Sequence, residues 1–448
     1  MNQQILLQCF IVLLLCILPL VFLRKNIPFI SLRTGSSMVF LMLFCVWPIA
    51  YMFNLDVSWE YLQIWGVSAD EYFPIVLWYA IIGILLFHIF YLLPVGQQIA
   101  NRFTPRRKRW NSKGVFVVCV VATVASLVSA IAIWAQLGGF STISILFGRA
   151  KLELGGYHYL TLGITLLRAS ILIAWAYSIT HKFPRSVIWG QVVLYSIINV
   201  TLGGRNQVVG LWLMLFVVHL LLTKETLSFG GGMSRLRKIS TGALVVGVSL
   251  VLLVVIRGFR TTYDASTLGL GATIVESVGS SLVAFITPLI TEFDQMEVFA
   301  TIVAITPIQI PFWNGQSYLD IFTLPVPRSL WPEKPIPVRL TLGNLIRGQN
   351  VGIPMTMIGE FYINFGIFGI VSGMSLFGVM CKTLDRWAYT FRDNPSVIIF
   401  FVFVLTNLPI ILTRYFYGWF GALLIFTLSL IIVLRFTRTS KSVGVRRW

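Results

Sequence analysis

Long apolar blocks alternate along the chain with shorter segments in which polar and charged residues gather. A helix that crosses the hydrocarbon core of a bilayer needs about 20 mainly apolar residues, and its backbone polar groups must be satisfied within the helix. By this criterion the pattern predicts eleven membrane spans, at 5–23, 36–54, 72–94, 114–134, 161–180, 186–202, 207–222, 240–256, 357–380, 396–413 and 418–434. We therefore expect an all-α polytopic membrane protein that forms a single transmembrane domain over residues 1–448.

The segment 257–355, between the eighth and ninth predicted spans, is the longest connection. It contains two weaker apolar runs, 272–290 and 298–312, each of which proline interrupts. Proline and charge disfavour a lipid-exposed span, so we expect these runs to form interfacial or re-entrant helices. If both runs cross the membrane, the number of spans rises to thirteen and the orientation is unchanged.

Composition also excludes a soluble globular domain. Hydrophobic residues make up 57% of the chain and charged residues 11%, and the mean hydropathy is +0.85. A typical soluble domain has about 25% charged residues. The class of protein indicated is a multi-pass membrane protein.

The net charge of +18 could indicate a nucleic-acid partner, but its location along the chain argues otherwise. When the basic connections are assigned to the cytoplasm, they hold 23 of the 34 Lys and Arg but only three of the 16 Asp and Glu. This asymmetry orients a membrane protein, and basic connections of this kind anchor it at the lipid surface. We expect the N-terminus outside, the C-terminus in the cytoplasm, segment 257–355 outside, and no nucleic-acid partner. The basic residues assigned to the cytoplasm are Arg24, Lys25, Arg33, Arg102, Arg106, Arg107, Lys108, Arg109, Lys113, Lys182, Arg185, Lys224, Arg235, Arg237, Lys238, Lys382, Arg386, Arg392, Arg435, Arg438, Lys441, Arg446 and Arg447.

The cysteines do not have the spacing of metal ligands or of a disulfide framework. Each lies within or at the end of an apolar block, so we interpret them as packing residues and predict no metal site. They are Cys9, Cys16, Cys45, Cys119 and Cys381.

Basic residues outside the cytoplasmic connections form a candidate anion site. Except for Arg168, which falls within a span, they lie on the predicted external side, where the orientation rule disfavours them. Arginine offers phosphate oxygens a planar pair of donors, whereas pairing with external acids is the alternative interpretation. The residues are Arg149, Lys151, Arg168, Arg205, Arg257, Arg260, Arg328, Lys334, Arg339, Arg347 and Arg414.

Some of these residues lie in distinctive local sequences. Arg205 belongs to the tight Gly-rich turn LGGRNQ, and Arg257 and Arg260 have the i, i+3 spacing of one helix face. The proline-rich strap PRSLWPEKP (327–335) presents Arg328, Trp331 and Lys334 on a stiff backbone. Trp331 is either an interfacial anchor or a platform on which a sugar stacks.

Glu360 is the leading candidate for a catalytic base, since it is a lone carboxylate at the start of an apolar run. Desolvation there would favour proton uptake, although simple pairing with an arginine is the alternative. Asp264, Asp294 and Asp320 are competing carboxylates. Of the histidines, only His158 falls on the predicted external side, which argues against a zinc hydrolase or a histidine-dependent acyltransferase.

Four motifs follow one another in the chain: the Gly-Gly-Arg turn, the Arg257 and Arg260 pair, the strap and the run GEFYINFG (359–366). Through these motifs the chain resembles, over about residues 200–370, the Wzy-type O-antigen or oligosaccharide repeat-unit polymerases. The resemblance implies a GT-C-like glycosyltransferase of the bacterial inner membrane, with its active site on the periplasmic side and no cofactor. It implies polyprenyl-diphosphate-linked glycans as donor and acceptor, and a chain-length regulator as a partner. Carried over by position, Arg205, Arg257, Arg260 and Arg328 would hold the donor diphosphate and Glu360 would be the base. Trp331, Lys334, Arg339 and Arg414 join the substrate-binding candidates, and Asp264 and His158 the catalytic ones.

Two other functions remain alternatives. An O-antigen ligase would use the same donor but transfer the glycan to a lipid A core. A lipid-linked oligosaccharide flippase is a transporter, and such proteins commonly show internal repeats and charged groups near the membrane midplane. Here the spans carry few charges, which argues against the flippase. The strap and the run GEFYINFG favour the polymerase over the ligase.

Overall fold

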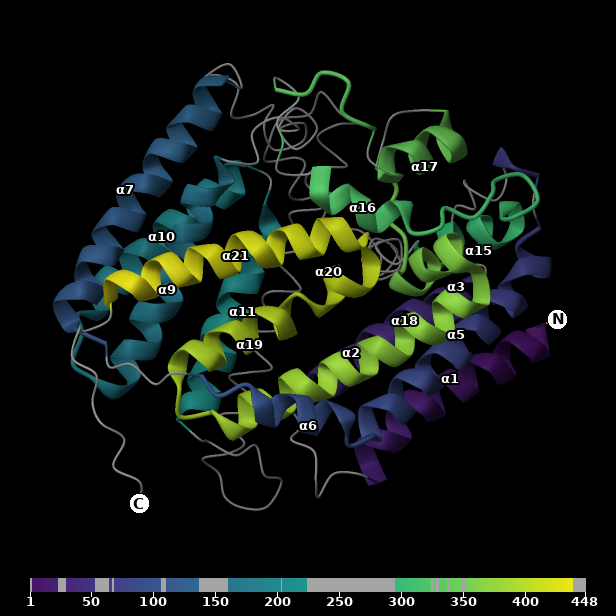
Figure 1. Ribbon diagram of the computed structural model, residues 1–448, viewed down its shortest axis with the longest axis horizontal. Coiled ribbons are helices and arrows are strands. Elements are labelled where there is room, and N and C mark those ends of the chain that lie inside the picture. Colours follow the sequence, from purple (N-terminus) through teal and green to yellow (C-terminus); the bar gives the residue numbers. More distant parts are fainter. Residues whose placement is uncertain are drawn as a thin grey trace, which may run out of the picture. The chain divides into compact units, whose positions relative to one another are not determined.

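The computed structural model describes residues 2–22, 30–52, 64–66, 68–105, 110–136, 160–202, 204–223, 295–323, 326, 330–336, 338–348 and 352–437. This part of the chain is helical and contains no β-strand, as predicted (Figure 1). The predicted span 240–256 and the weak apolar run 272–290 lie outside the described residues.

The chain divides into two compact units. The first contains Met1–Phe103, Ser281–Tyr389 and Asn407–Gly421, and the second contains Thr104–Ser280, Thr390–Thr406 and Ala422–Trp448. Whether these units form a single transmembrane domain stays a prediction.

The first unit is built mainly from helices of the N-terminal hundred residues and of the segment after residue 295. Helix α2 continues through a π-helical turn, η1, into α3, and Ser31 caps its start because its Oγ accepts the Thr34 N–H at 3.2 Å. The elements are α1 (Asn2–Phe22), α2 (Leu32–Leu41), η1 (Met42–Val46), α3 (Trp47–Met52), α5 (Ala69–Leu92), α6 (Val95–Arg102), α15 (Gln295–Ile305), α16 (Gln316–Thr323), α17 (Val338–Arg347), α18 (Met357–Thr390), α20 (Leu408–Thr413) and the beginning of α21 (Phe416–Thr437).

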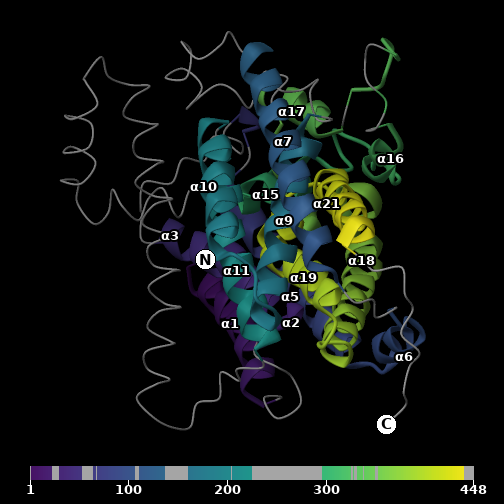
Figure 2. The ribbon, with the colours of Figure 1, turned by 90° about the vertical axis from the view of Figure 1, so that its left-hand side faces the viewer.

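The second unit contains the remaining long helices, which Figure 2 shows side by side. Small residues let them approach closely, as membrane helices require: a Cβ placed on Gly163 of α9 would lie 2.7 Å from the Ala125 carbonyl oxygen of α7. The elements are α7 (Ser112–Gln136), α9 (Thr161–Thr180), α10 (Arg185–Thr201), α11 (Arg205–Leu222), α19 (Pro395–Thr406) and most of α21.

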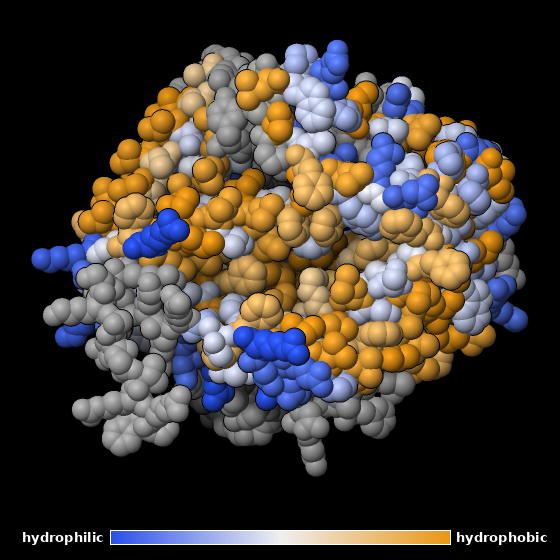
Figure 3. All heavy atoms as spheres, viewed as in Figure 1, coloured by the Kyte–Doolittle hydropathy of each residue, from blue (hydrophilic) through white to orange (hydrophobic). Residues whose placement is uncertain are grey.

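Six described helical segments are long and apolar enough to cross a membrane. Many of their outward side chains are apolar and exposed, among them Val121 and Val128 on α7, as lipid contact requires (Figure 3). The chain is therefore a multi-pass membrane protein. The segments are Leu32–Ile49, Glu71–Leu92, Ser112–Ala135, Thr161–Thr180, Met357–Thr390 and Gly418–Thr437, and shorter apolar helices cover Gln3–Ile17, Asn206–Leu222, Gln295–Ile305 and Pro395–Thr406.

The predicted continuous span 396–413 is wrong. Helix α19 ends at Thr406, Asn407 leaves the helical conformation, and α20 starts again at Leu408. Pro409 lies in the first turn of α20, where its missing N–H does no harm, whereas within a continuous helix it would break the hydrogen-bond ladder.

The predicted helix in the run 298–312 forms as α15, which ends at Ile305 just before Pro307. All eleven of its residues are buried, so it is packed inside the protein and does not lie on the membrane surface. At 1.5 Å per residue it is about 16 Å long, too short to cross the bilayer.

Candidate active site

The start of α18 turns sharply within the GEFYINFG run. Residues 357–364 are helical, Phe365 and Gly366 leave the helix at φ −142° and φ +60°, and the helix then resumes to Thr390. The positive φ is a conformation that glycine adopts readily and other residues rarely do. The predicted span therefore begins with a separate short helix of its own (Figure 1).

This short helix folds back along the long part of α18. A Cβ on Gly369 would lie 2.1 Å from the Phe361 carbonyl oxygen, and one on Gly373 would lie 2.5 Å from the Phe361 ring. In a straight helix, residues eight positions apart are about 12 Å apart. The contact therefore means that the chain reverses direction at Gly366, which gives a re-entrant hairpin that ends inside the protein.

The Glu360 carboxylate lies on this short helix and is 1% exposed. The Ser317 hydroxyl of α16 donates to Glu360 Oε1 at 2.7 Å, and the Phe416 N–H donates to Oε2 at 2.7 Å. Phe416 is the first residue of α21, so the carboxylate faces the positive end of that helix. Each oxygen of the buried carboxylate thus has a donor, from a different helix.

Asn364 holds this arrangement together. Its Nδ2 donates to Ser317 Oγ at 2.8 Å and to the Glu360 carbonyl oxygen at 2.8 Å, and its Oδ1 accepts the Gly315 N–H at 2.9 Å. The Trp313 N–H also donates to the Ile363 carbonyl oxygen at 3.0 Å. Sequence reasoning missed Ser317 and Asn364, although an amide four residues after Glu360 in an apolar run was an available signal for the second.

Helix α16 turns its polar side inward and its apolar side outward. Ser317 and Asp320 are buried, whereas Leu319 is 60% and Phe322 is 77% exposed. An outward apolar face is typical of a helix in contact with lipid, although α16 lies outside the two runs, 272–290 and 298–312, for which interfacial or re-entrant helices were expected.

Two further groups of α16 shape the electrostatics around Glu360. Burial, and then the negative charge of Glu360, raise the pKa of the Tyr318 hydroxyl, so this group remains protonated at physiological pH. The Tyr318 ring packs on Phe416 at 5.5 Å between centroids. Asp320 is close enough for its charge to act on Glu360.

The predicted substrate-binding residues are only partly described. Lys334 Nζ donates to the Val326 carbonyl oxygen at 3.0 Å, Trp331 is 39% exposed, and Arg414 is exposed two residues before Phe416. Arg339 lies in α17 of the first unit and Arg205 begins α11 of the second, but their side chains are not among those described. The grouping of these cations around Glu360 stays a prediction. Residues His158, Arg257, Arg260, Asp264 and Arg328 lie outside the described residues.

A second buried carboxylate, Asp385, lies near the other end of α18. The Leu32 N–H donates to Oδ1 at 2.8 Å and the Tyr91 hydroxyl donates to Oδ2 at 2.7 Å. The guanidinium of Arg33 lies 5.1 Å from the centre of the Tyr91 ring. Arg33 is 1% exposed, so its predicted role as a lipid-facing anchor is wrong: it is packed between helices, where aromatic and polar groups face it.

The cysteines behave as packing residues, as predicted, since all five are buried free thiols.

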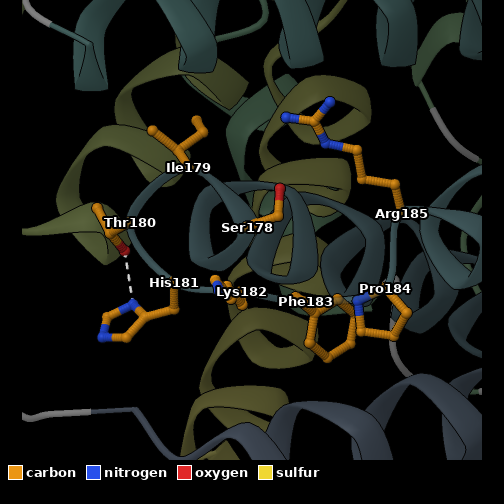
Figure 4. A pocket seen from close by; sticks show the side chains of 8 residues that line it. All are labelled: Ser178, Ile179, Thr180, His181, Lys182, Phe183, Pro184 and Arg185. Atoms are coloured by element: carbon orange, nitrogen blue, oxygen red, sulfur yellow. Dashed lines mark hydrogen bonds between the residues drawn. The ribbon is translucent and has the colours of Figure 1, made fainter.

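A surface cavity of about 640 Å³ lies at the turn between α9 and α10. It is lined by residues 178–185, among them Lys182 and Arg185, and Thr180 Oγ1 lies 2.7 Å from His181 Nδ1 (Figure 4). Because a single helix connection forms it at the end of the span Thr161–Thr180, we interpret it as part of the basic membrane-surface region and not as the active site.

Comparison with known proteins bears on the segment that contains Glu360. No curated protein and no solved structure matches the chain. One family model, described as a domain of unknown function (DUF8712), matches residues 260–391. The chain is thus similar to that family over the segment that holds Ser317, Glu360 and Asn364.

Proposed function

We propose that the chain is a membrane glycosyltransferase that polymerises polyprenyl-diphosphate-linked oligosaccharide repeat units into a bacterial surface polysaccharide. In this reaction an acceptor sugar hydroxyl attacks the anomeric carbon of the donor glycan, and the bond between that carbon and the diphosphate breaks. Polyprenyl diphosphate leaves, and the hydroxyl proton passes to Glu360.

The observation that carries the proposal is the hydrogen bond from Ser317 to Glu360. An alcohol already donates to this carboxylate at 2.7 Å, within the range that a general base needs to accept a proton. An acceptor hydroxyl that takes the place of Ser317 Oγ, or transfers its proton through it, meets the same base. Asn364 fixes the direction of the Ser317 hydroxyl by donating to Oγ.

The surroundings of Glu360 suit a lipid-linked substrate. The apolar outer face of α16 belongs to the same helix that contributes Ser317, so a polyprenyl chain can remain in lipid while its sugars approach the carboxylate. The predicted external arginines would neutralise the diphosphate as it leaves, a task for which arginine is well suited.

Contacts within the first unit support the proposed orientation, with Glu360 on the periplasmic side of the inner membrane. They join residues that the charge pattern assigns to one side: Leu32 bonds to Asp385, and Trp387 Nε1 donates to the Phe103 carbonyl oxygen at 3.0 Å. From Gly366 to Asp385 the helix rises about 28 Å at 1.5 Å per residue, close to the thickness of the hydrocarbon core.

Reporter fusions will check this orientation. We expect fusions after Arg109 and Arg438 to give a cytoplasmic signal, because both residues lie in basic connections. We expect a fusion near Gly315 to give an external signal, because the Gly315 N–H donates to Asn364 in the Glu360 site. A cytoplasmic signal at Gly315 would remove the site from the compartment in which lipid-linked repeats are polymerised.

Deletion of the gene in its own host, followed by gel analysis of the envelope glycans, tests the function. A polymerase predicts that surface glycan stops at a single repeat unit. Complete loss of surface glycan would instead indicate a ligase or a flippase, and an unchanged glycan ladder would contradict all three.

A further inference from the structure

Arg168 is a cation inside a membrane span. It lies seven residues after the start of α9, within the candidate span Thr161–Thr180, and is 7% exposed. At 1.5 Å per residue this is about 10 Å from the helix start. A charged side chain at such a depth is costly and rare, and usually marks a binding or transport site.

The guanidinium of Arg168 is oriented by its neighbours. Its Nη1–H donates to Gln207 Oε1 of α11 at 2.9 Å. Its central carbon lies 5.0 Å and 5.3 Å from the ring centres of Phe403 and Phe426. Those two rings stack at 3.7 Å, so helices α9, α11, α19 and α21 of the second unit, which Figure 2 labels, fix the position of the group.

The charge of Arg168 is oriented but is not neutralised. Its Nε is buried without a hydrogen-bond partner, and no carboxylate in the described part of the chain pairs with it. Aromatic faces, an amide oxygen and the buried Tyr195 hydroxyl, which also hydrogen-bonds with Arg168, stabilise a cation only in part, since none of them carries a full negative charge. A buried guanidinium with a free donor is therefore ready to accept an anion.

The position of Gln207 connects Arg168 to the LGGRNQ turn. Gln207 is the third residue of α11, and its N–H donates to the Gly204 carbonyl oxygen at 2.9 Å. The same turn carries Arg205, so a second cation begins the helix that holds Arg168 in place. The anion that best matches arginine is a phosphate or diphosphate, whose oxygens accept paired N–H groups.

We propose that Arg168 binds the phosphate groups of a polyprenyl-diphosphate lipid within the membrane, and that Gln207 is the residue that positions its guanidinium. The choice of this lipid rests on the function proposed above. The alternative role is structural: a cation held between aromatic rings that only ties four helices together.

Two variants separate these roles. Arg168→Met removes the charge and keeps an unbranched apolar side chain, which a membrane interior tolerates. Gln207→Glu places a carboxylate where Oε1 now accepts from Nη1, so that the protein itself neutralises Arg168. If Arg168 binds the lipid, both variants weaken binding, whereas a structural role predicts that Gln207→Glu leaves binding unchanged. Asn206→Asp is the matched control, because it adds the same charge in the same turn of α11 at an exposed position.

The experiment uses the full chain in nanodiscs of phosphatidylcholine, titrated with undecaprenyl diphosphate, with undecaprenol and inorganic pyrophosphate as comparison ligands. We expect the wild type and Asn206→Asp to bind undecaprenyl diphosphate alike, and Arg168→Met and Gln207→Glu to bind it roughly 10- to 100-fold more weakly, as for loss of a charged hydrogen bond. Undecaprenol should not compete. Size-exclusion profiles confirm that each variant is folded.

Three results would overturn the inference: no binding by the wild type, equal binding by folded Gln207→Glu, or competition by inorganic pyrophosphate as strong as that by the lipid. The proposed function is tested separately by gene deletion. If deletion stops glycan at one repeat while the Arg168 variants bind normally, only this inference fails. If deletion leaves the glycan unchanged while the variants lose binding, the proposed polymerase fails and the diphosphate site stands.

Discussion

Glu360→Gln should lower polymer synthesis by about 100- to 10,000-fold per folded molecule, the range expected when a positioned general base is lost. The substitution keeps the size of the side chain, and the Gln oxygen can still accept one of the two hydrogen bonds that Ser317 and Phe416 now donate. It cannot accept the proton of an attacking hydroxyl. The measurement is polymer synthesis in proteoliposomes, normalised to folded protein, together with binding of the lipid-linked donor, which should be retained.

Asp385→Asn is the matched control for this variant. Asp385 lies on the same helix, is also buried, and likewise accepts one backbone N–H and one hydroxyl group. A purely structural role for Glu360 predicts that the two variants lose stability to similar degrees and keep similar normalised activity. Near-normal activity of folded Glu360→Gln would eliminate Glu360 as the base and direct attention to Asp264, Asp294, Asp320 or His158.

Gly369→Ala should prevent stable folding of the re-entrant hairpin. The added Cβ would lie 2.1 Å from the Phe361 carbonyl oxygen, and this is a contact with the backbone that no side-chain rotation relieves. Overpacking of a core costs about 1–3 kcal/mol, and more where the backbone must move. We expect the free energy of unfolding to fall by about 3 kcal/mol or more, seen as loss of folded protein in detergent thermal-unfolding assays.

Gly418→Ala provides the comparison, because a Cβ at this exposed position in α21 meets nothing within 4 Å. Alanine favours a helix over glycine by about 1 kcal/mol, so this variant should be as stable as the wild type or more so. Equal stability of the Gly369 and Gly418 variants would contradict the close fold-back of residues 357–364 on α18.

The sequence singled out Glu360 but not its partners. A carboxylate in an apolar run is conspicuous in the sequence, since the free energy needed to place its charge in a membrane depends on the residues immediately around it. Ser317 is 43 residues from Glu360 and Phe416 is 56 residues away. A serine and a backbone amide carry no sign in the sequence that they will meet a carboxylate at that separation.

Breaks in the helices were also missed for a local reason. The run 396–413 is mainly apolar, and proline is also favoured in the first turn of a helix, so the hydropathy pattern did not reveal the interruption at Asn407. In the same way the turn at Gly366 depends on a backbone conformation that glycine permits but does not require.

The sequence by itself determined that the protein belongs in a membrane and where most of its apolar helices lie, because transfer of a helix into lipid depends on the composition of each segment alone. Only the tertiary structure decided which polar groups meet inside it. The reversal at Gly366 brings Glu360 to Ser317 and Phe416, and the packing of four helices leaves Arg168 oriented with a free donor. These contacts depend on the path of the whole chain, since buried polar groups are satisfied by whatever the fold places within hydrogen-bond reach.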